Sequence, residues 1–167
     1  MLLDIYEMQY PLVIDAFEKR YNKKCKILVR LHPNLLEKSN KLKLPINIIN
    51  VTEYPDMQEL LCASDYVISD YSSTLDYSLF DKPILLFCPD LERYQSNERK
   101  LYIKLNELPF LIAETNEQLV NNIVNFDYSQ YIEKLHKAYN KYGLCENGNA
   151  CKKIVELMNE LCNDQAD

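Results

Sequence analysis

The sequence predicts an α/β domain built on a doubly wound parallel sheet, with helices covering both faces. Short apolar runs rich in Val, Ile and Leu alternate along the chain with segments whose apolar residues recur at helical spacing. The runs are apolar at almost every position rather than at alternate ones, which is typical of strands buried on both faces. Ligands of such a sheet bind beyond the carboxyl ends of its strands, so a functional site is expected at that edge.

Four apolar runs are expected to be strands of this sheet. The first of them stops at His32 and Pro33, because proline cannot donate a hydrogen bond to a neighbouring strand. A shorter apolar run, Phe110–Ala113, follows a polar stretch. The four predicted strands are Cys25–Leu31, Ile46–Val51, Tyr66–Ser69 and Pro83–Cys88.

Helical spacing of apolar residues predicts a helix at the start of the chain and further helices between and after the strands. Asp56 to Glu59 and Thr115 to Gln118 have the spacing of capping boxes, which mark helix N-termini. Pro11 predicts a kink in the first helix. The predicted helices are Asp4–Tyr21, a short one after Asp56, Ser72–Phe80, one that opens at Thr115, Tyr128–Tyr142 and Asn149–Cys162.

The domain organisation follows from the length and from the first element. A chain of 167 residues is long enough for one substantial core and too short for two domains with a cleft between them. Doubly wound domains normally open on a strand, whereas this chain opens on a helix. We therefore expect residues 1–167 to form one domain that lacks its first strand.

Charge and hydropathy exclude several classes of partner. The formal net charge is −6, and broad electrostatic attraction to nucleic acid or anionic lipid requires a surplus of clustered Lys and Arg. We expect no nucleic-acid partner, and any anionic ligand must be held locally. No apolar run approaches the roughly 20 residues that cross a bilayer.

Cysteine and histidine usage indicates a reduced, cytoplasmic protein without a metal or another cofactor. The six cysteines include no Cys-x-x-Cys pair, and no secretory signal precedes them. Cys25, Cys62 and Cys88 lie in apolar runs, where thiols behave as small hydrophobes. His32 and His136 are far apart in sequence and lack partners at metal-binding spacing, and His136 is expected to be solvated.

A cluster of hydroxyl side chains follows the third predicted strand. Free amides at a helix N-terminus, together with the hydroxyls of Ser72 and Ser73, can hold a phosphate without cationic side chains. No glycine occurs before Gly143, which excludes the glycine-rich phosphate loops. The alternative is purely structural, with Ser73 and Asp76 forming a capping box and Asp70 forming a turn.

Arg30 and His32 form a second candidate at the carboxyl end of the first predicted strand. They would lie on the same sheet edge as the serine cluster, where both could face one anion. His32 could donate a hydrogen bond to a phosphate or protonate a leaving group. Asp56 also falls near this edge, although capping its helix is the simpler role. The alternative for the pair is a loop histidine and a surface arginine.

Together these motifs resemble the CDP-glycerol glycerophosphotransferase family, and the resemblance covers nearly the whole chain. Weaker matches continue at Arg99–Tyr102, Glu107–Pro109 and Glu146–Ala150. Lys100 and Phe110 stand where the family usually has glycine, which affects the loop on the donor side. The stronger matches are Arg30–Pro33, Tyr54–Leu61, Ser64–Ser73 with Asp76, Asp81–Ile84 and Asp90–Tyr94.

The resemblance implies the C-terminal, Rossmann-like half of a glycosyltransferase-B fold that binds the donor CDP-glycerol. It implies that His32 contacts the donor phosphates, and that an acceptor hydroxyl attacks the phosphorus that bears glycerol while CMP leaves. A polymer or lipid-linked acceptor and a general base would belong to an N-terminal domain at the inner face of the membrane. The residues implied to form the donor pocket are Ser69, Asp70, Ser72, Ser73 and Asp76.

Two other functions remain open at this point. The chain could be half of a sugar transferase that uses another nucleoside-diphosphate sugar, although the Ser69–Ser73 block disfavours it. It could also be a noncatalytic nucleotide-binding or interaction module. A ribitol or sugar-phosphate donor would fit the same framework as glycerol.

Overall fold

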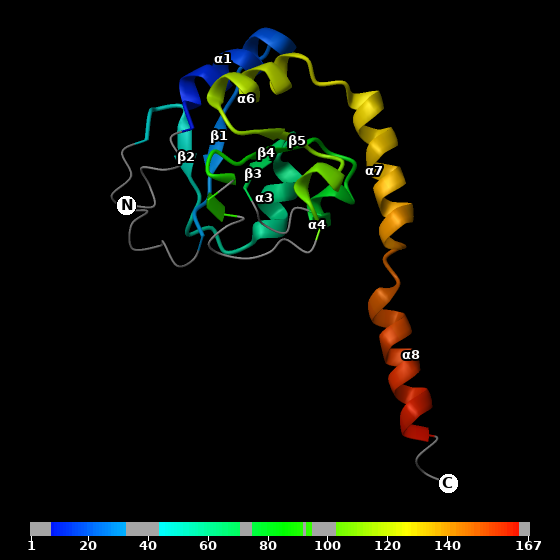
Figure 1. Cartoon of the computed structure of the whole chain (residues 1–167). Coiled ribbons are helices and arrows are strands. Elements are labelled where there is room, and N and C mark those ends of the chain that lie inside the picture. The colour runs from blue at the N-terminus through cyan, green and yellow to red at the C-terminus, as the bar shows by residue number, and fades with distance from the viewer. Residues whose placement is uncertain (1–7, 33–43, 71–74, 92, 95–102, 164–167) are drawn as a thin grey trace.

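The computed structural model describes residues 8–32, 44–70, 75–91, 93–94 and 103–163, with only the backbone of residues 75 and 76. Helices and parallel strands alternate, as the sequence predicts (Figure 1). The strands are β1 (Ile27–Val29), β2 (Ile48–Asn50), β3 (Val67–Ser69), β4 (Ile84–Phe87) and β5 (Leu111–Ala113). The helices are α1 (Tyr10–Tyr21), α3 (Met57–Ala63), α4 (Leu75–Ser78), α6 (Asn116–Val124), α7 (Tyr128–Tyr142) and α8 (Ala150–Asn163), with a 3-10 turn at Leu105–Glu107.

The strands are parallel, but among the described residues they form two separate sheets. β1 pairs with β2, with Ile27 opposite Ile48. β4 pairs with β3 on one side and with β5 on the other. The prediction of a parallel, doubly wound α/β fold is confirmed, while the division of the strands between two sheets was not predicted.

The hydrophobic core is centred on β4. All four of its residues are buried, because β4 has a strand on each side and helices over its faces. α1 and α6 lie side by side above the strands, and α3 and α4 lie on the opposite side (Figure 1). The helices contribute the buried side chains Val13, Ala16, Leu119, Ile123, Tyr131 and Leu135 to this core.

Local signals explain where the helices begin and end. Thr115 caps α6 by accepting a hydrogen bond from the Gln118 amide at 3.2 Å. Asp127 caps α7 in the same way. α7 ends at Gly143, whose φ of 66° is in the left-handed region that favours glycine.

Three predictions about individual segments were wrong. α1 begins at Tyr10, so Pro11 lies in its first turn, where its missing amide costs no hydrogen bond and causes no kink. β1 ends at Val29, two residues before the predicted end. Cys62 lies on the surface rather than among apolar side chains, because its helix α3 has no buried residue.

α8 is the predicted C-terminal helix, and its apolar side chains are exposed. Ile154, Val155, Met158 and Leu161 form the predicted stripe, and each is more than half exposed. Figure 1 shows α8 continuing away from the strands beyond α7. Within the described part of the chain, α8 therefore adds nothing to the core.

We expect Leu85→Ala to lower the free energy of unfolding by about 2–5 kcal/mol, because it leaves a cavity at a fully buried position of β4. Leu28→Ala is the matched control on β1, since Leu28 is 40% exposed. Urea denaturation followed by circular dichroism measures both. Equal losses for the two variants would contradict a core centred on β4.

Candidate functional site

The residues predicted for the site lie where β1 and β3 end. Arg30 and His32 follow β1 directly, while Ser69 is the last residue of β3 and Asp70 comes next. Ser72 and Ser73 lie outside the described residues. Asp76 belongs to α4, whose backbone follows this loop.

The loop after β1 is fixed by hydrogen bonds to the loop after β2. The Leu31 amide donates to Thr52 Oγ1 at 3.1 Å, and Thr52 is buried. Arg30 Nη1 donates to the backbone carbonyls of Val51 and Tyr54. Arg30 therefore links the two loops, and hydrogen bonds hold the two residues that precede His32. Because β1 ends at Val29, strand alternation does not set the directions of Arg30 and His32 as predicted.

Asp56 is the N-cap of α3. Its Oδ1 accepts a hydrogen bond from the Glu59 amide at 3.0 Å, as the capping-box spacing predicts. The Glu59 carboxylate accepts the Tyr54 hydroxyl at 2.5 Å, which raises the pKa of Tyr54 because the hydrogen bond favours the protonated phenol. Asp56 and Glu59 thereby tie the loop after β2 to the start of α3.

Buried polar contacts anchor the helix that follows the serine cluster. Tyr77 of α4 is 1% exposed, and its hydroxyl donates to the Ser64 carbonyl at 3.0 Å. Burial raises the pKa of Tyr77 well above its usual value, so it stays a hydrogen-bond donor. Ser78 is fully buried and lies 3.1 Å from the Tyr139 hydroxyl of α7. These hydrogen bonds connect α4 to the end of α3 and to α7.

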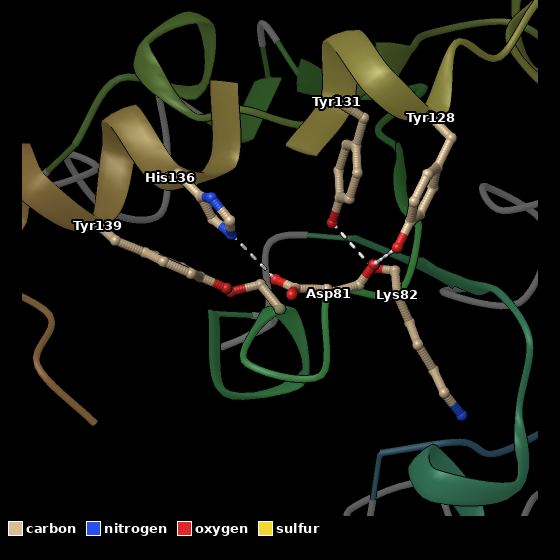
Figure 2. Close-up of polar contacts among 7 residues, drawn as sticks. Asp81, Lys82, Tyr128, Tyr131, His136 and Tyr139 are labelled. Carbon is tan, nitrogen blue, oxygen red and sulfur yellow. Dashed lines mark hydrogen bonds and ion pairs between the residues drawn. The ribbon is translucent and has the colours of Figure 1, made fainter. Parts of the chain in front are cut away.

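α7 also holds the turn between α4 and β4 (Figure 2). Figure 2 shows Tyr128 and Tyr131 reaching the carbonyls of Asp81 and Lys82, at 3.0 and 2.9 Å. Asp81 has a φ of 55°, a left-handed conformation that aspartate tolerates better than most residues. Its carboxylate lies 3.4 Å from His136 Nε2, and the His136 side chain is 55% exposed, so the prediction of a solvated histidine is confirmed.

Lys82 connects the same turn to α3. Its ammonium donates to the carbonyls of Cys62 and Ser64, at the end of that helix. Sequence reasoning missed Lys82 and the α7 tyrosines as supports of the site. Lys82 lies in the matched segment Asp81–Ile84, which gave it no role. The sequence signal for the α7 tyrosines is the high number of tyrosines, 13 in all, which helical amphipathicity alone can explain.

Two hollows in the described surface lie away from the predicted edge. One, of about 240 Å³, lies beside the amino end of β2 and includes the carboxylates Asp15 and Glu18, which disfavour an anionic ligand. The other lies between the start of β5, α6 and α7. In the described part of the chain, no group of His, Cys, Asp and Glu could hold a metal ion. None of the described helices is long and apolar enough to cross a membrane.

Comparison with known proteins matches nearly the whole chain to one family. Residues 3–160 match the family model of CDP-Glycerol:Poly(glycerophosphate) glycerophosphotransferase. The chain is 29% identical to the teichoic acid poly(glycerol phosphate) polymerase of Staphylococcus epidermidis, over 96% of this chain and 23% of that protein. It is 30% identical to the teichoic acid glycerol-phosphate primase of Bacillus spizizenii, over 82% of this chain and 35% of the primase.

Solved structures of the wall teichoic acid polymerase TagF have the same fold. One of them, a histidine-to-asparagine variant soaked with CDPG, superposes with a TM-score of 0.70 at 29% identity. The match covers 95% of this chain and 40% of the TagF chain. The chain thus spans between 23% and 40% of the length of these relatives.

We expect Asp56→Ala to destabilise the protein by about 1 kcal/mol, because the Glu59 amide loses its cap. Asp56→Ser is the matched control, since serine is also a good cap, and it should retain most of the stability. Thermal denaturation measures both. If Asp56 also binds a ligand, Asp56→Ser weakens that ligand's affinity while stability is retained.

Proposed function

Because the chain belongs to the CDP-glycerol:poly(glycerophosphate) glycerophosphotransferase family, we propose that it binds CDP-glycerol for transfer of glycerol phosphate to an acceptor hydroxyl. The observation that carries this proposal is the position of the candidate residues. Arg30 and His32 follow one parallel strand and Asp70 follows another, which is the edge where doubly wound sheets bind ligands. The product would be a teichoic-acid-like polymer.

The donor diphosphate would lie between the loops after β1 and β3. On one side, His32 donates to a phosphate oxygen, and Arg30 orients the loop that carries it. On the other side, the donor contacts the hydroxyls of Ser72 and Ser73. Ser69, Asp70 and Asp76 form the rest of this side of the pocket. Backbone amides and hydroxyls suit an anion in a protein whose net charge is −6, because they bind it without a cationic patch.

The reaction is a displacement at the phosphorus that bears glycerol. The acceptor oxygen forms a bond to this phosphorus as the bond to the bridging diphosphate oxygen breaks, and CMP leaves. A general base takes the proton of the acceptor hydroxyl. Negative charge builds on the departing CMP phosphate, and a protonated His32 would stabilise it. Hydrogen bonds supply this stabilisation, so the proposal needs no cofactor.

The acceptor and its general base belong to a part of the enzyme outside this domain. This chain corresponds to 23% of the S. epidermidis polymerase and 40% of TagF, so most of each relative lies outside the match. We propose that residues 1–167 are the donor-binding domain, and that an acceptor domain completes the cleft. The complete enzyme would bind the polymer or lipid-linked acceptor at the cytoplasmic face of the membrane.

The glycine replacements in the donor-side loop have different consequences. Phe110 is buried in the core beside β5, so the larger side chain is accommodated inside the domain. The Phe110 side chain therefore does not reach the proposed phosphate site. Lys100 lies outside the described residues.

Ser72 and Ser73 are proposed to bind the donor through their hydroxyls. The double change Ser72→Ala and Ser73→Ala should weaken CDP-glycerol binding, while the free energy of unfolding changes by no more than about 1–2 kcal/mol, the scale of a lost cap. Both residues are changed because either hydroxyl could replace the other. Titration calorimetry measures the affinities for CDP-glycerol, CDP-ribitol and a UDP-sugar. Comparison of the three affinities identifies the class of donor. Unchanged affinity would assign these serines to capping alone, and no binding of any donor would favour the noncatalytic module.

The second prediction concerns turnover. In an enzyme that joins this chain to the remaining part of the S. epidermidis polymerase, His32→Ala should lower kcat by about 10²–10³. The donor KM should change far less, because the interaction strengthens as charge develops on CMP. His136→Ala is the control, since His136 contacts Asp81 on α7's side of the domain. Near-normal turnover of the His32 variant would contradict this role.

A further inference from the structure

The hollow between β5, α6 and α7 lies at the end of the sheet opposite the proposed donor site. Leu111, which is the first residue of β5, borders it, so the hollow is beside the amino end of that strand. The candidate donor residues instead follow the carboxyl ends of β1 and β3. Figure 1 shows β5 beneath α6 and the chain leading from α6 into α7. The volume of the hollow is about 170 Å³.

The floor of this hollow, meaning its buried and apolar lining, consists of carbon surface. Pro109, Phe126 and Tyr131 are buried, and Leu111 is half-buried. The rings of Phe126 and Tyr131 lie 5.3 Å apart between their centroids. The Tyr131 hydroxyl already donates to the Lys82 carbonyl at 2.9 Å, so this side chain offers the hollow its carbon atoms. An apolar floor with aromatic rings is typical of small-molecule sites.

Side-chain amides dominate the rim, meaning the exposed or half-buried polar lining. Gln130 of α7 supplies one of them, and three asparagines at the end of α6 supply the others. Asparagine is a poor helix former, so helix propensity does not explain this group. The other hollow has a single amide side chain, Asn47, in its lining. The rim asparagines are Asn121, Asn122 and Asn125.

Hydrogen bonds within the domain hold the asparagine amides in place. Asn122 Nδ2 donates to the Ile112 carbonyl of β5 at 3.0 Å. Asn125 Nδ2 donates to Asn121 Oδ1 at 2.8 Å and also to the Asn121 carbonyl. Polar groups that are already fixed cost a ligand less ordering entropy than mobile ones. The alternative is that these amides only tie α6 to β5, which the experiment below distinguishes.

Each rim amide keeps one group that is not used within the described part of the chain. The unused donors are Asn121 Nδ2 and Gln130 Nε2, and the unused acceptors are Asn122 Oδ1 and Asn125 Oδ1. A hydroxyl both donates and accepts hydrogen bonds, whereas a carboxylate only accepts and an ammonium only donates. A mixture of donors and acceptors therefore fits a ligand with several hydroxyls.

The two charged residues of the rim favour a neutral ligand. Lys134 and Asp127 contribute opposite formal charges. Lys134 Nζ donates to Gln130 Oε1 at 3.2 Å, and Asp127 Oδ1 accepts the Gln130 amide at 2.9 Å. An anion here would gain from the ammonium but would be repelled by the carboxylate. A phosphate group is thus a poorer match than an uncharged polyhydroxy compound.

We propose that this hollow binds one neutral sugar ring. A cavity of about 150 Å³ holds one benzene molecule, so an open hollow of 170 Å³ has room for one six-membered ring. The C–H groups of the sugar would pack on the floor, while its hydroxyls exchange hydrogen bonds with the rim amides. This site goes beyond the proposed function, because it takes a different ligand at the opposite ends of the strands. Donor and sugar can therefore be bound at the same time.

NMR titration of the ¹⁵N-labelled full chain tests the site. The probes are the methyl glycosides of glucose, galactose and N-acetylglucosamine, and the signals are the rim side-chain amides. We expect saturable shifts with at least one glycoside and a millimolar Kd, because a single ring makes few contacts. Cyclohexanol, a ring of the same size with one hydroxyl, should shift these signals much less.

Three results of this titration would contradict the proposal. The first is that none of the glycosides shifts the rim amides at about 0.1 M. The second is that cyclohexanol binds as well as the glycosides, which would make the hollow merely apolar. The third is that glycerol 3-phosphate binds the rim more tightly than they do, which would assign the site to an anion.

Gln130→Ala separates a binding role from a structural one. It removes an unused amide donor at an exposed position and leaves the backbone bond to Asp127 intact, so the chain should fold. We expect the glycoside Kd to rise about three- to tenfold. Asn140→Ala is the matched control, since Asn140 is an exposed amide of α7 outside the hollow. Asn121→Ala repeats the test from α6.

Equal glycoside affinities in the Gln130, Asn121 and Asn140 variants would reduce the rim amides to ties between helix and strand. Thermal denaturation of each variant shows that a loss of affinity is not a loss of fold. Because CDP-glycerol is absent from every titration, failure of the sugar site leaves the donor-binding proposal untouched.

Discussion

Burial of β4 between β3 and β5 is the constraint on which the other elements depend. Its apolar side chains can leave water only if strands flank it and helices cover both faces, which places α6 and α7 against it. The turn before β4 is then within reach of the α7 tyrosines. Through that turn and through Ser78, the same core fixes α4, which follows β3 in the chain. The proposed donor site is thus supported by packing on the far side of the sheet.

The two halves of the site are held by different interactions. The half after β3 is supported by buried tyrosine hydroxyls, whereas the half after β1 depends on hydrogen bonds between two loops. At least one guanidinium nitrogen of Arg30 donates hydrogen bonds to the carbonyls of Val51 and Tyr54. A positioning role for Arg30 leaves His32 as the side chain of this pair that is proposed to contact the donor phosphates. The proposed site would therefore hold an anion at one point, although the net charge of −6 does not attract anions generally.

Local features were predictable from sequence, and long-range ones were not. α7 was predicted with its observed bounds because periodicity, the Asp127 cap and Gly143 all act within a few residues. The caps at Asp56 and Thr115 were found for the same reason. The bond from Tyr131 to Lys82 and that from Arg30 to Tyr54 join segments far apart in sequence, and either polar group could have faced water. The division of the sheet was equally hidden, since an apolar run does not reveal which strands flank it.

The arrangement of the two sheets and the proposed donor affinity should be linked thermodynamically. His32 follows β1 and Asp70 follows β3, and these strands belong to different sheets among the described residues. A donor that bridged the two loops would restrict the distance between them. Any other contact that restricts the same distance would lower the ordering cost that such a donor must meet. Because the coupling is reciprocal, binding of the proposed donor would stabilise that contact by the same factor.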